Sequence, residues 1–229
     1  MIDILYEDNH IIVVKKPFNV PSQKDSSNDE CMVDIIKNYI KEKYEKSGNV
    51  YVGLIHRLDR PTGGIMVFAK TSKAAERLTK DFKEHKITKK YLAVLSGVPR
   101  DKIGHLENYL KKDEKTNTVR LATLSEEGSK LASLDYRVLE YNEKYSLVEI
   151  DLHTGRSHQI RVQMSANKTP VFADFKYGKG ANSKDINLGL FAYKLQFVHP
   201  TTKKLMTFVC YPPLDEAPWK YFNIEKHLI

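Results

Sequence analysis

The chain has 229 residues, a length that one folded domain can hold and that is sufficient to bury a core. Lysine and arginine outnumber aspartate and glutamate by 37 to 29, so the net charge of +8 favours a polyanionic partner, although a basic surface without a specific partner stays open. Cys31 and Cys210 lie far apart, and the polar start and short apolar runs suit neither export nor membrane insertion, so we expect a cytoplasmic protein without disulfides or structural zinc.

The first half of the chain alternates strand and helix patterns. A β-branched run ends before Pro17, and a loop follows it. Two later stretches carry apolar residues at helical spacing, and Ser72 is expected to cap the second. The expected strands cover residues 11–14, 51–55 and 65–70, and the expected helices cover residues 31–46 and 72–85.

The second half is predicted to consist mostly of strands. Residues 155–166 fit both a strand and a helix, and we favour the helix. The tail from residue 212 is expected to pack on the surface of a sheet. No repeat, low-complexity tract or linker occurs, so residues 1–229 are predicted to form one domain. The expected strands cover residues 91–95, 119–122, 134–139, 146–152, 190–197 and 205–211.

The strongest candidate for chemistry is a carboxylate on a glycine-rich loop. The motif HRLDRPTGG at residues 56–64 places Asp59 between Arg57 and Arg60, and Pro61 with the two glycines predicts a tight turn. Neighbouring cations favour an ionised, nucleophilic Asp59. A turn cap or a structural ion pair is an equally open interpretation of these residues alone.

A second polar cluster is the motif TGRSHQIR at residues 154–161. It concentrates Arg156, His158 and Arg161, and on a helix the last two share one face. Guanidinium groups pair with phosphates or with a carboxylate such as Asp59. A solvated helix face is the alternative interpretation.

A basic run, KITKKY at residues 86–91, ends in an aromatic residue. Lys89 and Lys90 beside Tyr91 suit a stacked, unpaired base, an interaction worth roughly 1–3 kcal/mol per base. A half-buried core tyrosine is the simpler interpretation of Tyr91 in isolation.

Several common cofactor and metal motifs are missing. The sequence contains no GxGxxG, Walker loop or HExxH, which leaves nucleotide and zinc-protease chemistry unsupported. The eight histidines are scattered, and His56, His153 and His158 near the motifs are interpreted as satisfied polar side chains rather than as an acid or base. No metal site and no cofactor are expected.

Taken in order, these segments resemble the RluA-type pseudouridine synthases. The motif VKKP at 14–17 is similar to the family's opening element, HRLDRPTGG to its catalytic loop, Lys90-Tyr91 to its base-stacking site and TGRSHQIR to its third motif. Departures are Gly63 in place of serine, Phe191 in place of histidine and Gln163 where histidine is frequent. The closing segments of the family are matched at residues 174–178, 190–192 and 199–200.

The resemblance implies an α/β (α+β) fold: a mixed, mostly antiparallel central sheet flanked by helices, with a central active-site cleft. It implies an isomerase that converts uridine to pseudouridine in ribosomal or transfer RNA, as a monomer and without metal or cofactor. Relatives often carry an S4-like domain before the catalytic one. None is expected here, because the first strand begins close to Met1.

The resemblance also assigns roles to residues. Asp59 would be the nucleophile, Tyr91 would stack on the flipped uracil, and Arg161 would pair with Asp59. Arg57 would occupy the place that the uridine leaves in the RNA. The other residues expected to contact RNA are Arg60, Thr62, Lys89, Lys90, Arg156 and His158.

Two alternatives stay open at this point. One is a catalytically silent RNA-binding factor on the same scaffold. The other is a hydrolytic N-glycosidase that uses Asp59 and releases free uracil. Attack of Asp59 on C1′ and abstraction of a ribose proton are both compatible with the motif.

Overall fold

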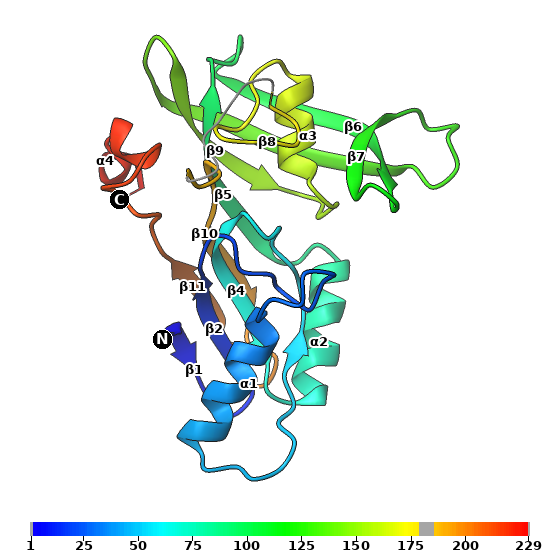
Figure 1. Cartoon of the computed structure of the whole chain (residues 1–229), viewed down its shortest axis with the longest axis vertical. Coiled ribbons are helices and arrows are strands. Elements are labelled where there is room, and N and C mark those ends of the chain that lie inside the picture. The colour runs from blue at the N-terminus through cyan, green and yellow to red at the C-terminus, as the bar shows by residue number, and fades with distance from the viewer. Residues whose placement is uncertain (1, 179–185, 229) are drawn as a thin grey trace. The chain divides into compact units, whose positions relative to one another are not determined.

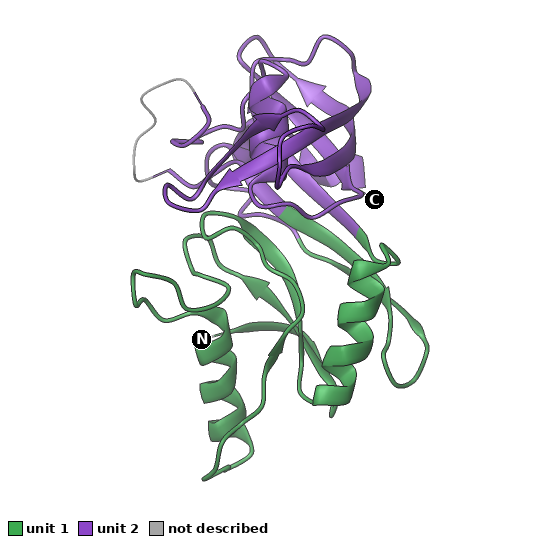
Figure 2. Cartoon of the chain, turned by 90° about the vertical axis from the view of Figure 1, so that its right-hand side faces the viewer, with its two compact units in different colours: residues 1–88, 192–210 green, residues 89–191, 211–229 purple. Residues whose placement is uncertain are grey.

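The computed structural model describes residues 2–178 and 186–228. The chain divides into two compact units (Figure 2): unit 1 comprises Met1–Thr88 and Ala192–Cys210, and unit 2 comprises Lys89–Phe191 and Tyr211–Ile229. A single catalytic domain over residues 1–229 stays a prediction. In the described ranges the longest helices have 12 residues, and none is long and apolar enough to cross a membrane.

Unit 1 is built on a sheet. Strands β1, β2 and β4 pair antiparallel, and Val13 of β2 lies opposite Val67 of β4. Strand β10 is the next neighbour of β4, β11 pairs antiparallel with β10, and the short β3 pairs with β4. The bounds are β1 (Asp3–Glu7), β2 (Ile11–Lys16), β3 (Gly53–Leu54), β4 (Gly63–Ala69), β10 (Leu190–Val198, in unit 1 from Ala192) and β11 (Leu205–Val209).

Helices α1 (Met32–Lys43) and α2 (Ser72–Lys83) flank these strands (Figures 1 and 2). Helices on both faces leave the inner strands without a solvated side, which explains why residues 11–14 and all of β4 are buried and apolar. The expected Ser72 cap of α2 is wrong by one residue. Thr71 keeps an extended backbone, and its side chain accepts from the Ala74 backbone N–H, so it caps the helix.

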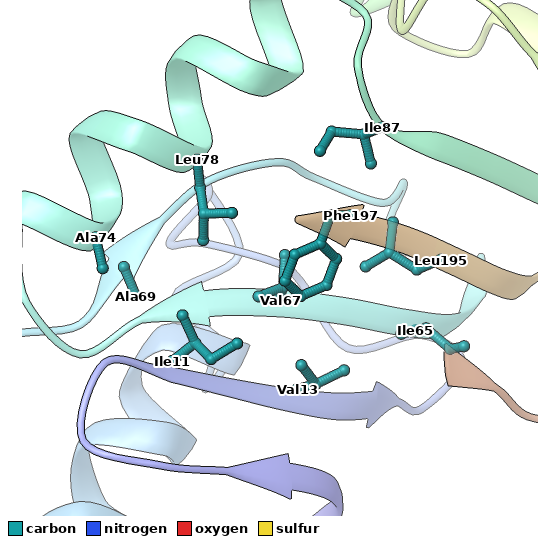
Figure 3. Close-up of a cluster of buried hydrophobic side chains, with 10 residues drawn as sticks. All are labelled: Ile11, Val13, Ile65, Val67, Ala69, Ala74, Leu78, Ile87, Leu195 and Phe197. Atoms are coloured by element: carbon teal, nitrogen blue, oxygen red, sulfur yellow. The ribbon is translucent and has the colours of Figure 1, made fainter. Parts of the chain in front are cut away.

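The core between the sheet and α2 anchors β4 (Figure 3). Ile65, Val67 and Ala69 lie at alternate positions of β4 and belong to one buried cluster with Ala74 and Leu78 of α2. Because β4 is held along its whole length, the loop that precedes it is attached to a rigid element. The remaining members of the cluster are Ile11, Val13, Ile87, Leu195 and Phe197.

Unit 2 is a second antiparallel system, in the order β5-β9-β8-β6-β7 (Figure 1). Helix α3 (Gln159–Ala166) contacts β6 and β7. The strand bounds are β5 (Thr88–Ser96, in unit 2 from Lys89), β6 (Ile103–Asp113), β7 (Thr118–Ala122), β8 (Lys130–Tyr141) and β9 (Tyr145–Leu152).

Differences from the sequence-based expectations concern the more polar elements. Strands β1 and β6 were missed, since both are only partly buried and β6 is rich in polar residues. The C-terminal segment forms a 3-10 turn, Trp219–Tyr221, and helix α4 (Ile224–Leu228). Trp219 is almost fully buried and meets Phe191 edge to face, so this part of the tail belongs to the core of unit 2.

Candidate active site

Asp59 lies on the loop between β3 and β4 of unit 1. The Thr62 N–H donates to the Asp59 carbonyl at 2.9 Å, which closes a turn over Arg60 and Pro61 directly before β4. Leu58 is buried, whereas Asp59 is partly exposed. The turn therefore presents a carboxylate at the end of a buried strand.

Both residues next to Asp59 are held by the end of β2 and the segment that follows it. The Ser22 hydroxyl donates to the Leu58 carbonyl at 2.8 Å and accepts from the Leu58 N–H at 3.2 Å. On the other side, Lys16 Nζ donates to the Arg60 carbonyl at 3.0 Å. These bonds fix the backbone before and after Asp59, which reduces the freedom of its carboxylate. No local sequence pattern connects Ser22 with this loop.

Lys16 is a fully buried cation. Besides Arg60, its ammonium donates to the carbonyls of Pro17 at 2.8 Å and Val20 at 2.7 Å, so its three N–H groups have three acceptors. Burial lowers the pKa of Lys16 to about 7, although the negative charge of Asp59 acts in the opposite direction. Lys16 of the opening Lys-Pro element thus holds the Asp59 loop in place.

Because of this lowered pKa, we expect the free energy of unfolding of the protein to depend on pH. An unfolded Lys16 keeps its proton up to its usual pKa of 10.5, whereas the folded one loses it above about 7. Between these values the unfolded state binds more protons, so stability rises with pH in this window and is lost as the pH falls toward 7. Relative to Lys16→Met, the free energy of unfolding of the wild type should increase by up to about 1.4 kcal/mol for each unit of rising pH.

Urea denaturation of both proteins at several pH values between about 7 and 10 measures this slope. The methionine variant leaves the carbonyl acceptors unpaired at every pH, so its constant loss of stability does not affect the comparison. Lys73→Met changes an exposed position of α2, and its free energy of unfolding should vary with pH as that of the wild type does. A Lys16→Met curve parallel to the wild type would contradict the lowered pKa.

The arginines beside Asp59 differ in their surroundings. Arg60 donates from Nε to the Asn19 carbonyl at 3.2 Å and from Nη1 to the Ser27 hydroxyl at 2.9 Å, and its Nη2 pairs with Asp29. Its side chain thereby closes the loop after β2. Arg57 is exposed. Contacts of either arginine with RNA stay predictions.

The surroundings of Thr62 and Gly64 indicate structural roles for both residues. Thr62 is 2% exposed, and its hydroxyl has no hydrogen-bond partner among the described residues, so a contact with RNA requires the turn to move. Gly64 has a φ of +124°, and a Cβ there would lie 2.3 Å from the Ala192 carbonyl oxygen. Only glycine permits this close approach of β4 to β10.

In unit 2, Tyr91 and the preceding lysines lie on β5. Tyr91 faces Ile150 of β9 in the pairing and is 8% exposed. Burial lowers the pKa of Lys89, while the charge of Asp151 opposes the shift. Lys90 Nζ lies 3.3 Å from Glu149. Lys89 and Lys90 are both partly buried, and their contacts with RNA stay predictions.

Arg161 of α3 is buried and forms a bidentate pair with Asp174. Its Nε and Nη2 donate to the two carboxylate oxygens, each at 2.7 Å. The Asp174 side chain has no exposed surface and also accepts from the N–H groups of Lys176 and Tyr177. The Tyr177 ring lies 5.1 Å from Arg161 Cζ. Four hydrogen bonds thus orient one carboxylate, and that carboxylate orients the guanidinium.

The motif TGRSHQIR is only partly helical. His158 has a φ of +52° and precedes α3, so the expected common helix face for His158 and Arg161 is wrong. Tyr177 connects the two instead, because its hydroxyl shares a 2.6 Å hydrogen bond with His158 Nδ1. Arg156 is exposed and donates from Nε to the Leu131 carbonyl at 2.9 Å. RNA contacts of Arg156 and His158 stay predictions.

Comparison with known proteins identifies the family. The family model described as RNA pseudouridylate synthase matches residues 10–166, a range that includes the Asp59 turn, Tyr91 and Arg161. The chain belongs to this family. An uncharacterized RNA pseudouridine synthase of Bacillus subtilis is 34% identical over 93% of this chain and 70% of its own length. Ribosomal large subunit pseudouridine synthase D of Zymomonas mobilis is 31% identical over the same shares.

The similarity confirms the RluA-type resemblance and the enzyme class. The chain is an RNA pseudouridine synthase, an isomerase. The solved structure of human RNA pseudouridylate synthase domain containing 4 matches 92% of this chain and 88% of its own length, with a TM-score of 0.77 and 24% identity. That likeness and the antiparallel strands of both units confirm the expected α/β pseudouridine synthase fold.

Proposed function

We propose that this pseudouridine synthase modifies a uridine in structured RNA with Asp59 as its nucleophile, and that it acts as a monomer in the cytoplasm. The observation that carries the nucleophile assignment is the turn itself. Asp59 is a partly exposed carboxylate between two backbone positions that Ser22 and Lys16 hold. Such restraint keeps a reactive group within a narrow range of positions.

In the proposed reaction the uridine leaves the RNA stack before chemistry begins, which costs a few kcal/mol. Asp59 attacks C1′ or removes a ribose proton, and the N1–C1′ bond breaks. The uracil rotates, and a C5–C1′ bond forms as C1′ releases the Asp59 oxygen or as Asp59 returns the ribose proton. The C5 proton then leaves, and N1 takes up a proton. Substrate and product are isomers, so this route needs no group donor.

In this proposal, other residues bind the RNA and orient the reacting groups. Tyr91 stacks on the uracil, and Arg161 pairs with Asp59 while Asp174 holds the opposite edge of the same guanidinium. Arg57 fills the space that the base leaves. The net charge of +8 supports contacts with phosphate, so RNA binding should weaken steeply with salt.

Ribosomal RNA is the proposed target ahead of transfer RNA, because Zymomonas mobilis and Borreliella burgdorferi relatives are named ribosomal large subunit pseudouridine synthases. The test maps pseudouridines in total RNA of cells with and without the gene. Loss of a site in ribosomal RNA that the purified chain restores supports the proposal. Loss confined to transfer RNA would overturn the target.

Product analysis separates the reaction from its alternatives. Nucleoside chromatography after incubation with the RNA should show pseudouridine in place of uridine. Bound but unchanged RNA would indicate a silent binding factor, and free uracil with abasic RNA would indicate an N-glycosidase. Either result would overturn the proposed reaction.

A further inference from the structure

Strand pairing in unit 2 gathers three side chains that are far apart in sequence. His105 of β6 lies directly opposite Asp135 of β8. On the other side of β8, Asp135 lies opposite Asp151 of β9, and His153 follows two residues later on the same face of the strand path. Neighbouring strands lie about 4.8 Å apart, so these three side chains meet.

Their polar atoms converge. His105 Nδ1 lies 2.6 Å from one oxygen of Asp135, and His153 Nε2 lies 2.8 Å from the other. One ligand atom from each residue lies within 4.8 Å of the other two. The side chains are 53%, 53% and 43% exposed for His105, Asp135 and His153, so solvent reaches the cluster.

We propose that this His-Asp-His cluster binds one divalent transition-metal ion of the Zn²⁺ type. His105 Nδ1, an Asp135 oxygen and His153 Nε2 are the ligands, and water completes a tetrahedral shell. Metal–ligand bonds of about 2.0–2.2 Å separate neighbouring ligand atoms by about 3.3 Å. The two short histidine–carboxylate contacts must therefore open by several tenths of an ångström, which half-exposed side chains do without repacking a core.

A carboxylate behind one ligand supports the assignment. With Nδ1 on the metal, His105 turns its Nε2–H toward Glu107, whose Oε2 lies 3.8 Å away. Metal-bound histidines usually direct their second ring nitrogen at such an acceptor, which orients the ring. Two imidazoles with one carboxylate suit Zn²⁺, Ni²⁺ or Cu²⁺ better than Mg²⁺ or Ca²⁺, which prefer oxygen ligands.

The ion would link strands β6, β8 and β9, which are neighbours in the sheet. Because the unfolded chain does not hold these ligands together, ion binding stabilises the folded state, and the stabilisation rises with the logarithm of the ion concentration above the dissociation constant. None of the ligands belongs to the motifs that carry the chemistry, so the expected role is structural.

The test titrates the full-length protein with Zn²⁺ and follows heat of binding, thermal stability and the ring ¹H–¹⁵N signals of its histidines. One ion per chain, a rise in melting temperature and shifts of the His105 and His153 signals are expected. His105→Ala, Asp135→Asn and His153→Ala should each weaken binding at least tenfold. His227→Ala removes a histidine that pairs with Glu140, outside the cluster, and should bind Zn²⁺ like the wild type.

Circular dichroism verifies that each variant is folded, and pseudouridine formation provides a second check of the native state. The proposal is overturned by the absence of saturable Zn²⁺ binding below about 100 μM. It is equally overturned if folded variants of all three ligands bind as tightly as the wild type, because the ion then sits elsewhere. Failure of pseudouridine formation in every protein, with Zn²⁺ binding intact, would count against the proposed function and leave the metal site supported.

Discussion

Replacing Asp59 by asparagine is expected to lower pseudouridine formation by at least about 10³-fold while the protein stays folded. Asparagine keeps the size of the side chain but removes the charge and the nucleophilic oxygen. The hydrogen bonds of Ser22 and Lys16 go to backbone atoms of Leu58 and Arg60, so the substitution leaves both in place. Loss of rate without loss of fold is therefore the expected pattern.

Tritium release from RNA labelled at uridine C5 measures this effect, because the C5 proton leaves only when the new bond forms. Asp59→Ala should behave in the same way and cannot revert by amide hydrolysis. The control is Asp3→Asn, which removes an exposed carboxylate from β1 of the same unit. Turnover within tenfold of the wild type by folded Asp59→Ala would remove Asp59 from the reaction.

Asp174→Asn is expected to destabilise the protein by about 3–5 kcal/mol, because the buried Arg161 guanidinium loses the charge of the carboxylate that accepts two of its hydrogen bonds. Lys176 and Tyr177 both donate to Oδ1 of Asp174, so the amide either keeps its oxygen there and turns its NH₂ group toward Arg161 Nε, or loses the bonds from these two residues. At temperatures where the variant is folded, kcat should fall because Arg161 loses its fixed orientation.

Urea denaturation gives the free energy of unfolding, and single-turnover assays separate kcat from RNA affinity. Asp101→Asn, at an exposed position between β5 and β6, should change neither quantity. The double variant Asp174→Asn/Arg161→Gln should lose less stability than the two single changes added together, since the second change removes the charge that has lost its Asp174 partner. A loss below about 1 kcal/mol in Asp174→Asn would show that the pair has little effect on folding.

Much of the fold could be predicted from local patterns. Strands β2 and β4 are continuous apolar runs because helices cover both faces, and α1 and α2 repeat apolar residues at helical spacing. Strand β6 could not be predicted, because a half-exposed strand of mainly polar residues has a weak periodic signal. The N-cap of α2 was wrong by one residue because Thr71 and Ser72 are both good caps, and backbone geometry decides between them.

By itself the sequence determined the family and the identity of the chemical groups, since both follow from an ordered set of short motifs. Tertiary structure alone decided the partners of those groups. Ser22 contacts Leu58 across 36 residues, Lys16 contacts Arg60 across 44, and His105 meets Asp135 across 30. Such pairs depend on strand register, and on which buried polar atoms need a hydrogen-bond partner. Neither feature is a property of a local stretch of sequence.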